Sequence, residues 1–220
     1  MKKIPITKYS QYGKYTKRQK MVNTLREYGI RDSRILSAFL TIPRHIFVPE
    51  NQQEQAYADT PLPIGYGQTI SQPYVIAYML EAMNLNPTDN VLEVGSGCGY
   101  VTALLSLLVK KVTGIELEKN LVKQSRDLLK ELEIKNVQIV HGDGYQGYAP
   151  NAPYDGILVS AAPETVPEPL FNQLKEGGTL IIPVGKYYQT LKKIQKKNGK
   201  PVETDLLSVT FVPLRKPLIY

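Results

Sequence analysis

A glycine-rich segment that follows a short apolar run constrains the fold of this chain more than any other feature. The run Val91 to Val94 leads into Glu93-Val94-Gly95-Ser96-Gly97-Cys98-Gly99-Tyr100, and further apolar residues follow. Glycines at such a position let the backbone turn tightly and approach a ligand that leaves no room for a Cβ atom. The segment therefore predicts a strand, a ligand-binding turn and a helix.

The same order of strand, turn and helix recurs along the chain after Asn90. Such repeats predict parallel strands with helices packed on them. The expected strands are Val91–Val94, Lys111–Ile115, Val137–Val140, Gly156–Ser160 and Thr179–Pro183, and the expected helices are 102–108, 120–132 and 167–175. The last two apolar runs, 189–194 and 206–214, have no helix between them and flank Asn198-Gly199, which is a strong hairpin signal. We therefore expect an α/β fold with a Rossmann-like, doubly wound sheet, mostly parallel with an antiparallel hairpin at one edge.

The residues before this core predict helices and one long irregular segment. Apolar side chains recur at helical spacing over 21–28, over 35–40 after a cap at Asp32 or Ser33, and over 74–83. Residues 43–73 are rich in proline and show little periodicity. A loop of that length is unusual in a compact domain unless it is functional, so we expect the site to include it.

The length of 220 residues favours one domain. We expect a basic flexible tail at 1–15 and a single domain at 16–220, with N-terminal helices and a substrate loop at 16–73 and the α/β core at 74–220. The net charge of +7 raises the question of nucleic-acid binding. The lysine runs near the N-terminus and at 192–200 lack interleaved stacking aromatics, which favours a solvated tail and an exposed hairpin. Three tyrosines near the N-terminus keep the nucleic-acid alternative open: Tyr9, Tyr12 and Tyr15.

Cys98 is the only cysteine, so the chain has no internal disulfide and we expect a cytoplasmic protein. The longest apolar stretch, 100–109, is far shorter than the roughly 20 residues of a membrane span, so no membrane segment is expected. His45 and His141 do not combine with Cys98 in a spacing typical of metal ligands, and we expect no metal site.

The spacing of the glycines argues against a dinucleotide-binding turn and indicates a different ligand. A dinucleotide-binding turn needs a third glycine where Tyr100 stands. Alternating Gly95, Gly97 and Gly99 behind Glu93 instead resemble motif I of class I S-adenosylmethionine-dependent methyltransferases. Two further acids strengthen this interpretation. Glu116 follows the second strand, about 20 residues on, where a carboxylate can accept ribose hydroxyls, and Asp143 ends the third strand, where this class places an acid that bonds adenine.

Two segments of the irregular region narrow the resemblance to one family. Residues 42–49, Ile-Pro-Arg-His-Ile-Phe-Val-Pro, and residues 56–73, Ala-Tyr-Ala-Asp-Thr-Pro-Leu-Pro-Ile-Gly-Tyr-Gly-Gln-Thr-Ile-Ser-Gln-Pro, closely resemble signatures of protein-L-isoaspartate O-methyltransferases. The resemblance extends from about Met21 to Leu214. It implies transfer of a methyl group from S-adenosylmethionine to the α-carboxylate of L-isoaspartyl residues in damaged proteins, which leaves S-adenosylhomocysteine and an ester that collapses to a succinimide.

The resemblance also implies roles for individual residues. Ser71 is expected to be catalytic, holding the substrate carboxylate by a hydrogen bond. The expected cofactor-binding residues are Gln68, Thr69, Ser71, Glu93, Gly95, Ser96, Gly97, Gly99, Glu116, Asp143 and Gly144. The expected substrate-binding residues are Ile64, Gly65 and Tyr74. From local sequence alone, Ser71 could instead be only the N-cap of the helix that begins near Pro73.

The chemistry of such a reaction fits the scarcity of histidine. A carboxylate is already ionised at pH 7, so it needs no general base. Three rivals remain: a nucleic-acid methyltransferase, a noncatalytic adenosine-binding protein, and an enzyme that modifies one dedicated peptide. The first is disfavoured because Ser160-Ala161-Ala162-Pro163 stands where amino-directed enzymes carry Asn/Asp-Pro-Pro-aromatic. We expect a monomer. The resemblance also implies that the stretch before Arg215 closes over the active site, and the presence of Arg215 leaves open how the pocket is closed in this protein.

Overall fold

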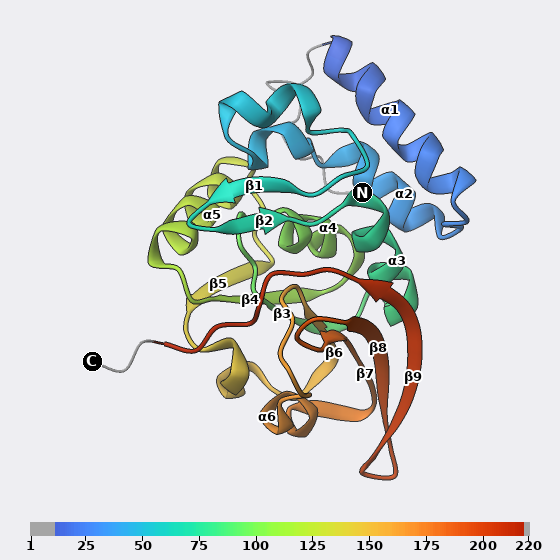
Figure 1. The fold of residues 1–220 in the computed structure, drawn as a ribbon, viewed down its shortest axis with the longest axis vertical. Coiled ribbons are helices and arrows are strands. Elements are labelled where there is room, and N and C mark those ends of the chain that lie inside the picture. Colours follow the sequence, from blue (N-terminus) through green and yellow to red (C-terminus); the bar gives the residue numbers. More distant parts are fainter. Residues whose placement is uncertain (1–11, 218–220) are drawn as a thin grey trace.

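Alternating side chains explain why the central sheet is buried on both faces in the computed structural model, which describes residues 12–217 (Figure 1). On β3 (Asn90–Val94), Val91 packs into the core on one face and Leu92 into the core on the other. On β6 (Tyr154–Val159), Leu158 and Ile157 divide in the same way. Successive residues of a strand point to opposite faces, so such apolar runs suit a sheet covered on both sides.

The sheet has seven strands in the order β5-β4-β3-β6-β7-β8-β9. Parallel pairing joins β5 (Val137–His141), β4 (Lys111–Glu116), β3, β6 and β7 (Leu174–Val184). Antiparallel pairing joins β7 to β8 (Gln189–Lys197) and β8 to β9 (Lys200–Val209). The mostly parallel sheet with an antiparallel hairpin at one edge is confirmed, as is the turn at Asn198-Gly199.

The chain order creates a crevice at one edge of this sheet. From β3 the chain builds β4 and then β5 on one side, and it later returns to β6 on the other side of β3. Ligands of open α/β sheets bind outside the carboxyl ends of the strands at such a reversal. The glycine-rich loop follows β3 and therefore lies at this reversal, where β4 is on one side of β3 and β6 on the other.

Several predicted boundaries after residue 160 are wrong: β7 begins at Leu174 and not at Thr179, and β8 continues to Lys197, past the predicted end at 194. The helix expected over 167–175 is the shorter α6 (Glu168–Asn172), because Leu174 already pairs with Tyr154 in β7. The strand expected over 206–214 is β9, which begins directly after the tight turn and ends at Val209. The side chain of Gln189 ends the ladder: it accepts from Phe211 N at 2.6 Å and donates to Phe211 O at 3.1 Å.

The helices of the core lie close to the expected ranges. They are α3 (Pro73–Met83), α4 (Tyr100–Leu108) and α5 (Lys119–Glu131). Among residues 12–217, no helix is long and apolar enough to cross a membrane.

The region before α3 is more ordered than the sequence predicts. Helices α1 (Tyr12–Glu27) and α2 (Ser33–Thr41) precede two 3-10 helices, η2 (Arg44–Phe47) and η3 (Glu50–Gln55). A hairpin follows, formed by β1 (Leu62–Gly65) and β2 (Gln68–Ile70). Residues 43–73 are therefore not a structureless loop. The hairpin lies between the N-terminal helices and the sheet (Figure 1).

The predicted tail boundary is also wrong in part. Residues 12–15 belong to α1, whereas the rest of the predicted tail, 1–11, lies outside the described residues. The basic side chains of α1 contact the body of the protein. Lys17 pairs with Glu54 at 2.6 Å, and the buried Arg18 donates to Leu40 O at 2.8 Å. These contacts hold α1 against the body of the protein.

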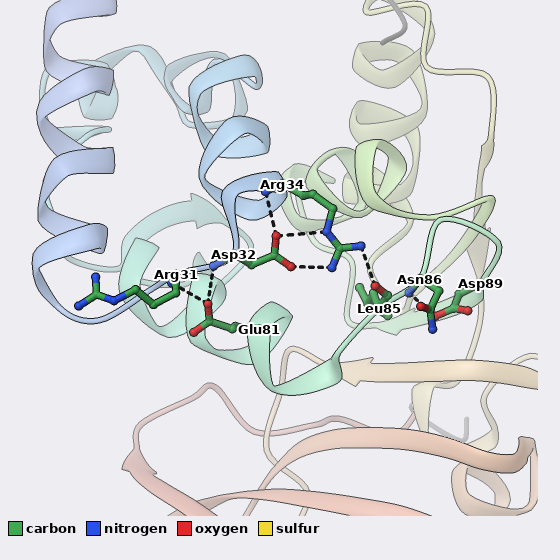
Figure 2. Close-up of polar contacts among 7 residues, drawn as sticks. All are labelled: Arg31, Asp32, Arg34, Glu81, Leu85, Asn86 and Asp89. Atoms are coloured by element: carbon green, nitrogen blue, oxygen red, sulfur yellow. Dashed lines mark hydrogen bonds and ion pairs between the residues drawn. The ribbon is translucent and has the colours of Figure 1, made fainter.

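Polar contacts also join the N-terminal helices to the segment before β3 (Figure 2). Asp32 is the N-cap of α2, as one of the two predicted alternatives had it. Glu81 of α3 accepts from Arg31 N at 2.7 Å and Asp32 N at 2.8 Å. Arg34 pairs with Asp32 at 2.6 Å and donates to Leu85 O at 2.9 Å. We call these residues, Arg31, Asp32, Arg34, Glu81 and Leu85, the distal network, because they lie at the amino end of β3, away from the glycine-rich loop.

Candidate active site

The glycine-rich loop is held against the end of β4. Gly95 N and Ser96 N both donate to Ile115 O, at 2.8 and 3.2 Å. Gly97 has a φ of +49°, and a Cβ atom there would lie 3.2 Å from Ile64 Cδ1 of the β1–β2 hairpin. Glycine is favoured where φ is positive and the backbone has a close neighbour. The hairpin and the glycine-rich loop are therefore in direct contact.

Glu116, at the end of β4, is fixed by this loop. Its carboxylate is buried and accepts from Gly97 N and from Glu118 N, each at 2.9 Å. A carboxylate held by two backbone donors keeps further acceptor capacity, because its two oxygens offer about four lone-pair sites. Glu116 could therefore also accept the hydroxyls of a ribose.

Glu93 lies beneath the loop. Its carboxyl is buried and accepts hydrogen bonds from Thr102 Oγ1 of α4 and, at 3.5 Å, from Ser160 Oγ after β6. Burial raises the pKa of Glu93 to about 8, and the nearby Glu116 carboxylate adds to the shift. A carboxyl that is neutral through most of the physiological range can be buried without a cationic partner. These contacts make Glu93 a support of the loop, and its contact with a cofactor stays a prediction.

Asp143 lies at the end of β5, next to β4 in the sheet. It caps the 3-10 helix η4 (Gly144–Gln146) by accepting from Tyr145 N at 2.9 Å. A Cβ atom on Gly144 would lie 2.7 Å from Val94 Cγ1, so only glycine fits there. Because β4 and β5 are parallel, Glu116 and Asp143 lie at the same edge of the sheet.

Ser71 follows β2 and precedes α3, but it does not cap that helix. The N-cap is Gln72, and the free Tyr74 N of the first turn donates to Asp59 Oδ1 at 2.8 Å. Among residues 12–217, no side chain or backbone group forms a hydrogen bond with Ser71 Oγ. The alternative that Ser71 is only a helix cap is therefore wrong.

Ser71 lines a pocket of about 360 Å³ between the base of the β1–β2 hairpin and the end of β9. Figure 1 shows the chain after β9 running back past the hairpin. The other residues around this pocket, which we call the Ser71 pocket, are Pro61, Thr69, Gln72, Val75, Ser208, Val209, Thr210 and Phe211. It is mixed in character, with hydroxyl groups on both walls.

The remaining predicted residues lie in different places, and of them only Thr69 lines the Ser71 pocket. Ile64 is buried against the glycine-rich loop. Gly65 is exposed near the tip of the hairpin, and Gln68 donates to Tyr66 O at 3.3 Å. Tyr74 is not part of the pocket lining, since its ring packs edge-on against Tyr28 at a centroid distance of 5.4 Å. Its contact with a substrate stays a prediction.

Arg44 and Asp59 were given no role by the sequence analysis. Arg44 Nη2 donates to Ser71 O at 2.9 Å, and Asp59 Oδ2 accepts from Gln72 Nε2 at 2.8 Å. Both residues stand inside the two segments that resemble the family signatures. The only local sign of a role for Arg44 is that it is a charged residue within the mostly apolar segment 42–48. That pattern does not indicate which residue Arg44 contacts.

The stretch before Arg215 crosses the carboxyl edge of the sheet. Ala162 N donates to Val212 O, and Leu214 N donates to Ala162 O, each at 2.8 Å. Tyr145 Oη donates to Leu214 O at 3.2 Å. Arg215 itself is exposed. These contacts hold the stretch against Ala162 and Tyr145, and the effect of Arg215 on closure of the pocket stays a prediction.

The histidines do not form a metal site. His45 Nδ1 and Tyr57 Oη share a hydrogen bond of 2.6 Å, and burial lowers the pKa of His45 to about 4. Within the described part of the chain, no group of three or more His, Cys, Asp or Glu side chains could hold a metal ion.

Comparison with known proteins decides the family. The family model for protein-L-isoaspartate(D-aspartate) O-methyltransferase matches residues 16–218. The chain belongs to this family. The protein-L-isoaspartate O-methyltransferase of Serratia proteamaculans (strain 568) is 48% identical over 198 residues, which cover 90% of this chain and 95% of the relative. That of Picosynechococcus sp. is 47% identical over 199 residues, or 90% of each chain.

Solved structures agree. A protein-L-isoaspartate O-methyltransferase structure superposes with a TM-score of 0.85 at 33% identity and covers 90% of this chain and 66% of that one. A Plasmodium falciparum structure described as a beta-aspartate methyltransferase (PCMT) in complex with S-adenosyl-L-homocysteine superposes with a TM-score of 0.80 at 33% identity, over 90% of this chain and 98% of that one. The predicted family is confirmed.

Proposed function

We propose that this protein methylates the α-carboxylate of L-isoaspartyl residues in damaged proteins and peptides, using S-adenosyl-L-methionine. The observation that carries the proposal is 48% identity to a protein-L-isoaspartate O-methyltransferase over 90% of the chain. The site supports it, because the β1–β2 hairpin contributes Thr69 to the Ser71 pocket and contacts the glycine-rich loop through Ile64. The product would be S-adenosyl-L-homocysteine, and the methyl ester formed on the substrate would then close to a succinimide.

The residues at the carboxyl edge fit an adenosine cofactor. Glu116 would accept the ribose hydroxyls while Gly97 N keeps it in place. Asp143 would bond the adenine amino group. The backbone of the loop 95–99 would line the methionine part, together with Gln68 and Thr69. When bound, S-adenosylmethionine supplies an electrophilic methyl group on a sulfonium ion, whose sulfur keeps the bonding electron pair after transfer.

The chain's own task is to orient a nucleophile and exclude water. The substrate carboxylate arrives ionised, and an oxygen of it attacks the methyl carbon without losing a proton, so no general base is needed. Charge is neutralised as the anion meets the sulfonium, so alignment in a water-poor pocket can supply much of the acceleration. Ser71 Oγ, which has no partner elsewhere in residues 12–217, would donate to the carboxylate and hold it in line.

The rivals make different demands on the surface. A nucleic-acid methyltransferase would use free cations, but Lys192 in the late lysine run pairs with Glu203 at 3.0 Å and Asp205 at 3.1 Å on the β8–β9 hairpin. This pairing favours the interpretation of an exposed structural hairpin. A monomeric state and a cytoplasmic location stay predictions, the second resting on Cys98 as the only cysteine.

The test offers the protein a panel of methyl acceptors with labelled S-adenosylmethionine. The panel contains an isoaspartyl peptide, bulk transfer RNA, duplex DNA and no acceptor. We expect label only in the isoaspartyl peptide. Label in nucleic acid alone would establish the first rival, and cofactor binding by calorimetry without transfer to any acceptor would favour a noncatalytic protein.

A further inference from the structure

We propose that Arg44 is a positioning residue for methyl transfer, which holds Ser71 in place relative to the glycine-rich loop. The inference rests on the proposed function and concerns the same site. Arg44 reaches Ser71 through the backbone and has no direct contact with the reacting atoms.

The guanidinium of Arg44 closes the base of the β1–β2 hairpin. Its Nη2 donates to Ser71 O at 2.9 Å and approaches Thr60 O at 3.4 Å. Thr60 precedes the hairpin and Ser71 follows it, so a single nitrogen spans both ends of the segment that carries Ile64, Gln68 and Thr69. Any shift of Arg44 would therefore move Ser71 and the hairpin together.

The same guanidinium contacts the helix that begins directly after the cofactor loop. Its central carbon lies 5.2 Å from the centroid of the Tyr100 ring. Tyr100 is buried, starts α4 immediately after Gly99, and packs edge-on against Phe47 at a centroid distance of 5.4 Å. A cation over an aromatic face is attracted to it. Arg44 thus stands between the loop expected to bind the cofactor and the residue expected to hold the substrate.

Arg44 shares with the buried Arg18 a guanidinium whose nitrogens are not all bonded within residues 12–217, but of the two only Arg44 donates to the backbone of Ser71. Arg44 is completely buried, its Nε and Nη1 have no hydrogen-bond partner, and among the described residues no carboxylate forms an ion pair with it. Asp59 is nearby, but its oxygens accept from Tyr74 N and Gln72 Nε2. Burial lowers the pKa of Arg44. A buried, unpaired cation opposes folding, whereas a fixed positive charge behind Ser71 would favour an arriving carboxylate.

The chain offers a matched control in Arg34. It belongs to the same N-terminal segment and also donates to a backbone oxygen, Leu85 O, but it lies in the distal network. We would prepare Arg44→Met, Arg44→Lys, Arg34→Met and Arg34→Lys. For each, the measurements are kcat and KM on an isoaspartyl peptide, the Kd of S-adenosylhomocysteine by calorimetry, and amide hydrogen exchange over residues 61–72.

We expect Arg44→Met to lower kcat at least about 30-fold, because a displacement of about 1 Å at a reacting group can cost about 100-fold in rate. Arg44→Lys should recover part of the loss, and the Kd of S-adenosylhomocysteine should stay within about threefold of the parent value. Exchange over 61–72 should be faster in both Arg44 variants and unchanged in both Arg34 variants. If Arg44→Met does not fold, Arg44→Lys carries the comparison.

Two results would overturn the inference: a kcat for the folded Arg44 variants within about twofold of the parent, or a Kd that rises as much as kcat falls. An inactive parent protein would instead contradict the proposed function. In that case, faster exchange over 61–72 in Arg44→Lys but not in Arg34→Lys would still support the inference that Arg44 holds Ser71 in place. Equal exchange rates in the two variants would reject it.

Discussion

The candidate active site and the distal network contain the same types of residue in different surroundings. Glu81 in the distal network and Glu116 in the candidate active site each accept two backbone N–H groups. Arg34 and Arg44 each donate to a backbone oxygen that is distant in the sequence, Leu85 O and Ser71 O respectively. The hydrogen bond with Asp32 raises the pKa of Arg34, whereas burial lowers the pKa of Arg44.

The two arginines differ in whether a carboxylate pairs with the guanidinium. Arg34 has its carboxylate partner beside it and its side chain remains 46% exposed, so solvent screens the pair. Among the described residues, Arg44 keeps two guanidinium nitrogens without a hydrogen-bond partner, and it donates to the backbone of Ser71, which lines the Ser71 pocket. The comparison therefore separates an arginine whose carboxylate partner accounts for its place in the fold from one that has no such partner within residues 12–217 and bonds the backbone of Ser71.

The largest expected difference separates the two glutamates. Glu116→Ala should raise the Kd of S-adenosylhomocysteine at least about 100-fold, because two hydrogen bonds to a charged acceptor are each worth roughly 1.5 to 3 kcal/mol. Glu81→Ala should leave the Kd unchanged and lower the free energy of unfolding by roughly 1.5 to 3 kcal/mol, because Glu81 accepts two backbone N–H groups at a partly exposed site. Asp143→Ala, which loses one such bond, should raise the Kd about tenfold. Calorimetry on the three variants checks the order, and an equal Kd for Glu116→Ala and Glu81→Ala would remove the distinction.

Ser71→Ala should have the next largest effect, on rate rather than on stability. Loss of a positioned hydrogen bond to a charged group costs roughly 1.5 to 3 kcal/mol, or about 10- to 150-fold in a single-turnover rate. The melting temperature should stay nearly unchanged because Asp59, not Ser71, bonds the first turn of α3. Ser208→Ala is the matched control, since Ser208 lines the same pocket. Equal losses in both variants would show that the pocket, and not Ser71 itself, is sensitive.

The pH dependence of stability tests the buried Glu93. Its pKa is raised from 4.5 to about 8 by burial. Above about pH 4.5 the unfolded state loses the proton that the folded state keeps, so stability falls as pH rises and levels off near the folded pKa of about 8. Relative to Glu93→Gln, the parent should lose about 1.4 kcal/mol per pH unit between about pH 5.5 and about pH 7.5. Urea titrations that give parallel pH profiles for the two proteins would contradict the assignment.

The smallest effect belongs to the distal ion pair. Arg34→Met should lower the free energy of unfolding by at most about 1 kcal/mol, because half-exposed ion pairs contribute little. Methyl transfer per folded molecule should not change. A fall in activity without a fall in stability would show that the distal network takes part in catalysis, and the comparison would fail.

Local sequence signals predicted the core well. Apolar runs bounded by glycine, and the Asn198-Gly199 turn, place β3 to β6 and the β8–β9 hairpin, because strand periodicity and turn geometry depend on neighbouring residues. Pro73 likewise marked the start of α3. The acids Glu116 and Asp143 could be placed at one edge because parallel strands end together.

Contacts between distant residues could not be predicted in the same way. Nothing near Arg44 in the sequence indicates that its guanidinium meets Ser71 O, 27 residues later. Asp59 removes the need for a cap at Ser71, and Gln189 ends β9 through its side chain, both by long-range bonds. Each case replaced a local preference with a tertiary partner, which is how the cap alternative and the end of β9 came to be wrong.

Selectivity between two isomeric peptides is the sharpest test that the protein methylates L-isoaspartyl residues. The peptides share one sequence and differ only in whether an aspartyl residue is linked through its side chain or its main chain. Single-turnover transfer of labelled methyl should be readily measured on the isoaspartyl peptide and remain at the level of the no-peptide control on its aspartyl isomer, with the label on the α-carboxylate by mass spectrometry. Equal rates on both isomers, or label at another group, would contradict the account.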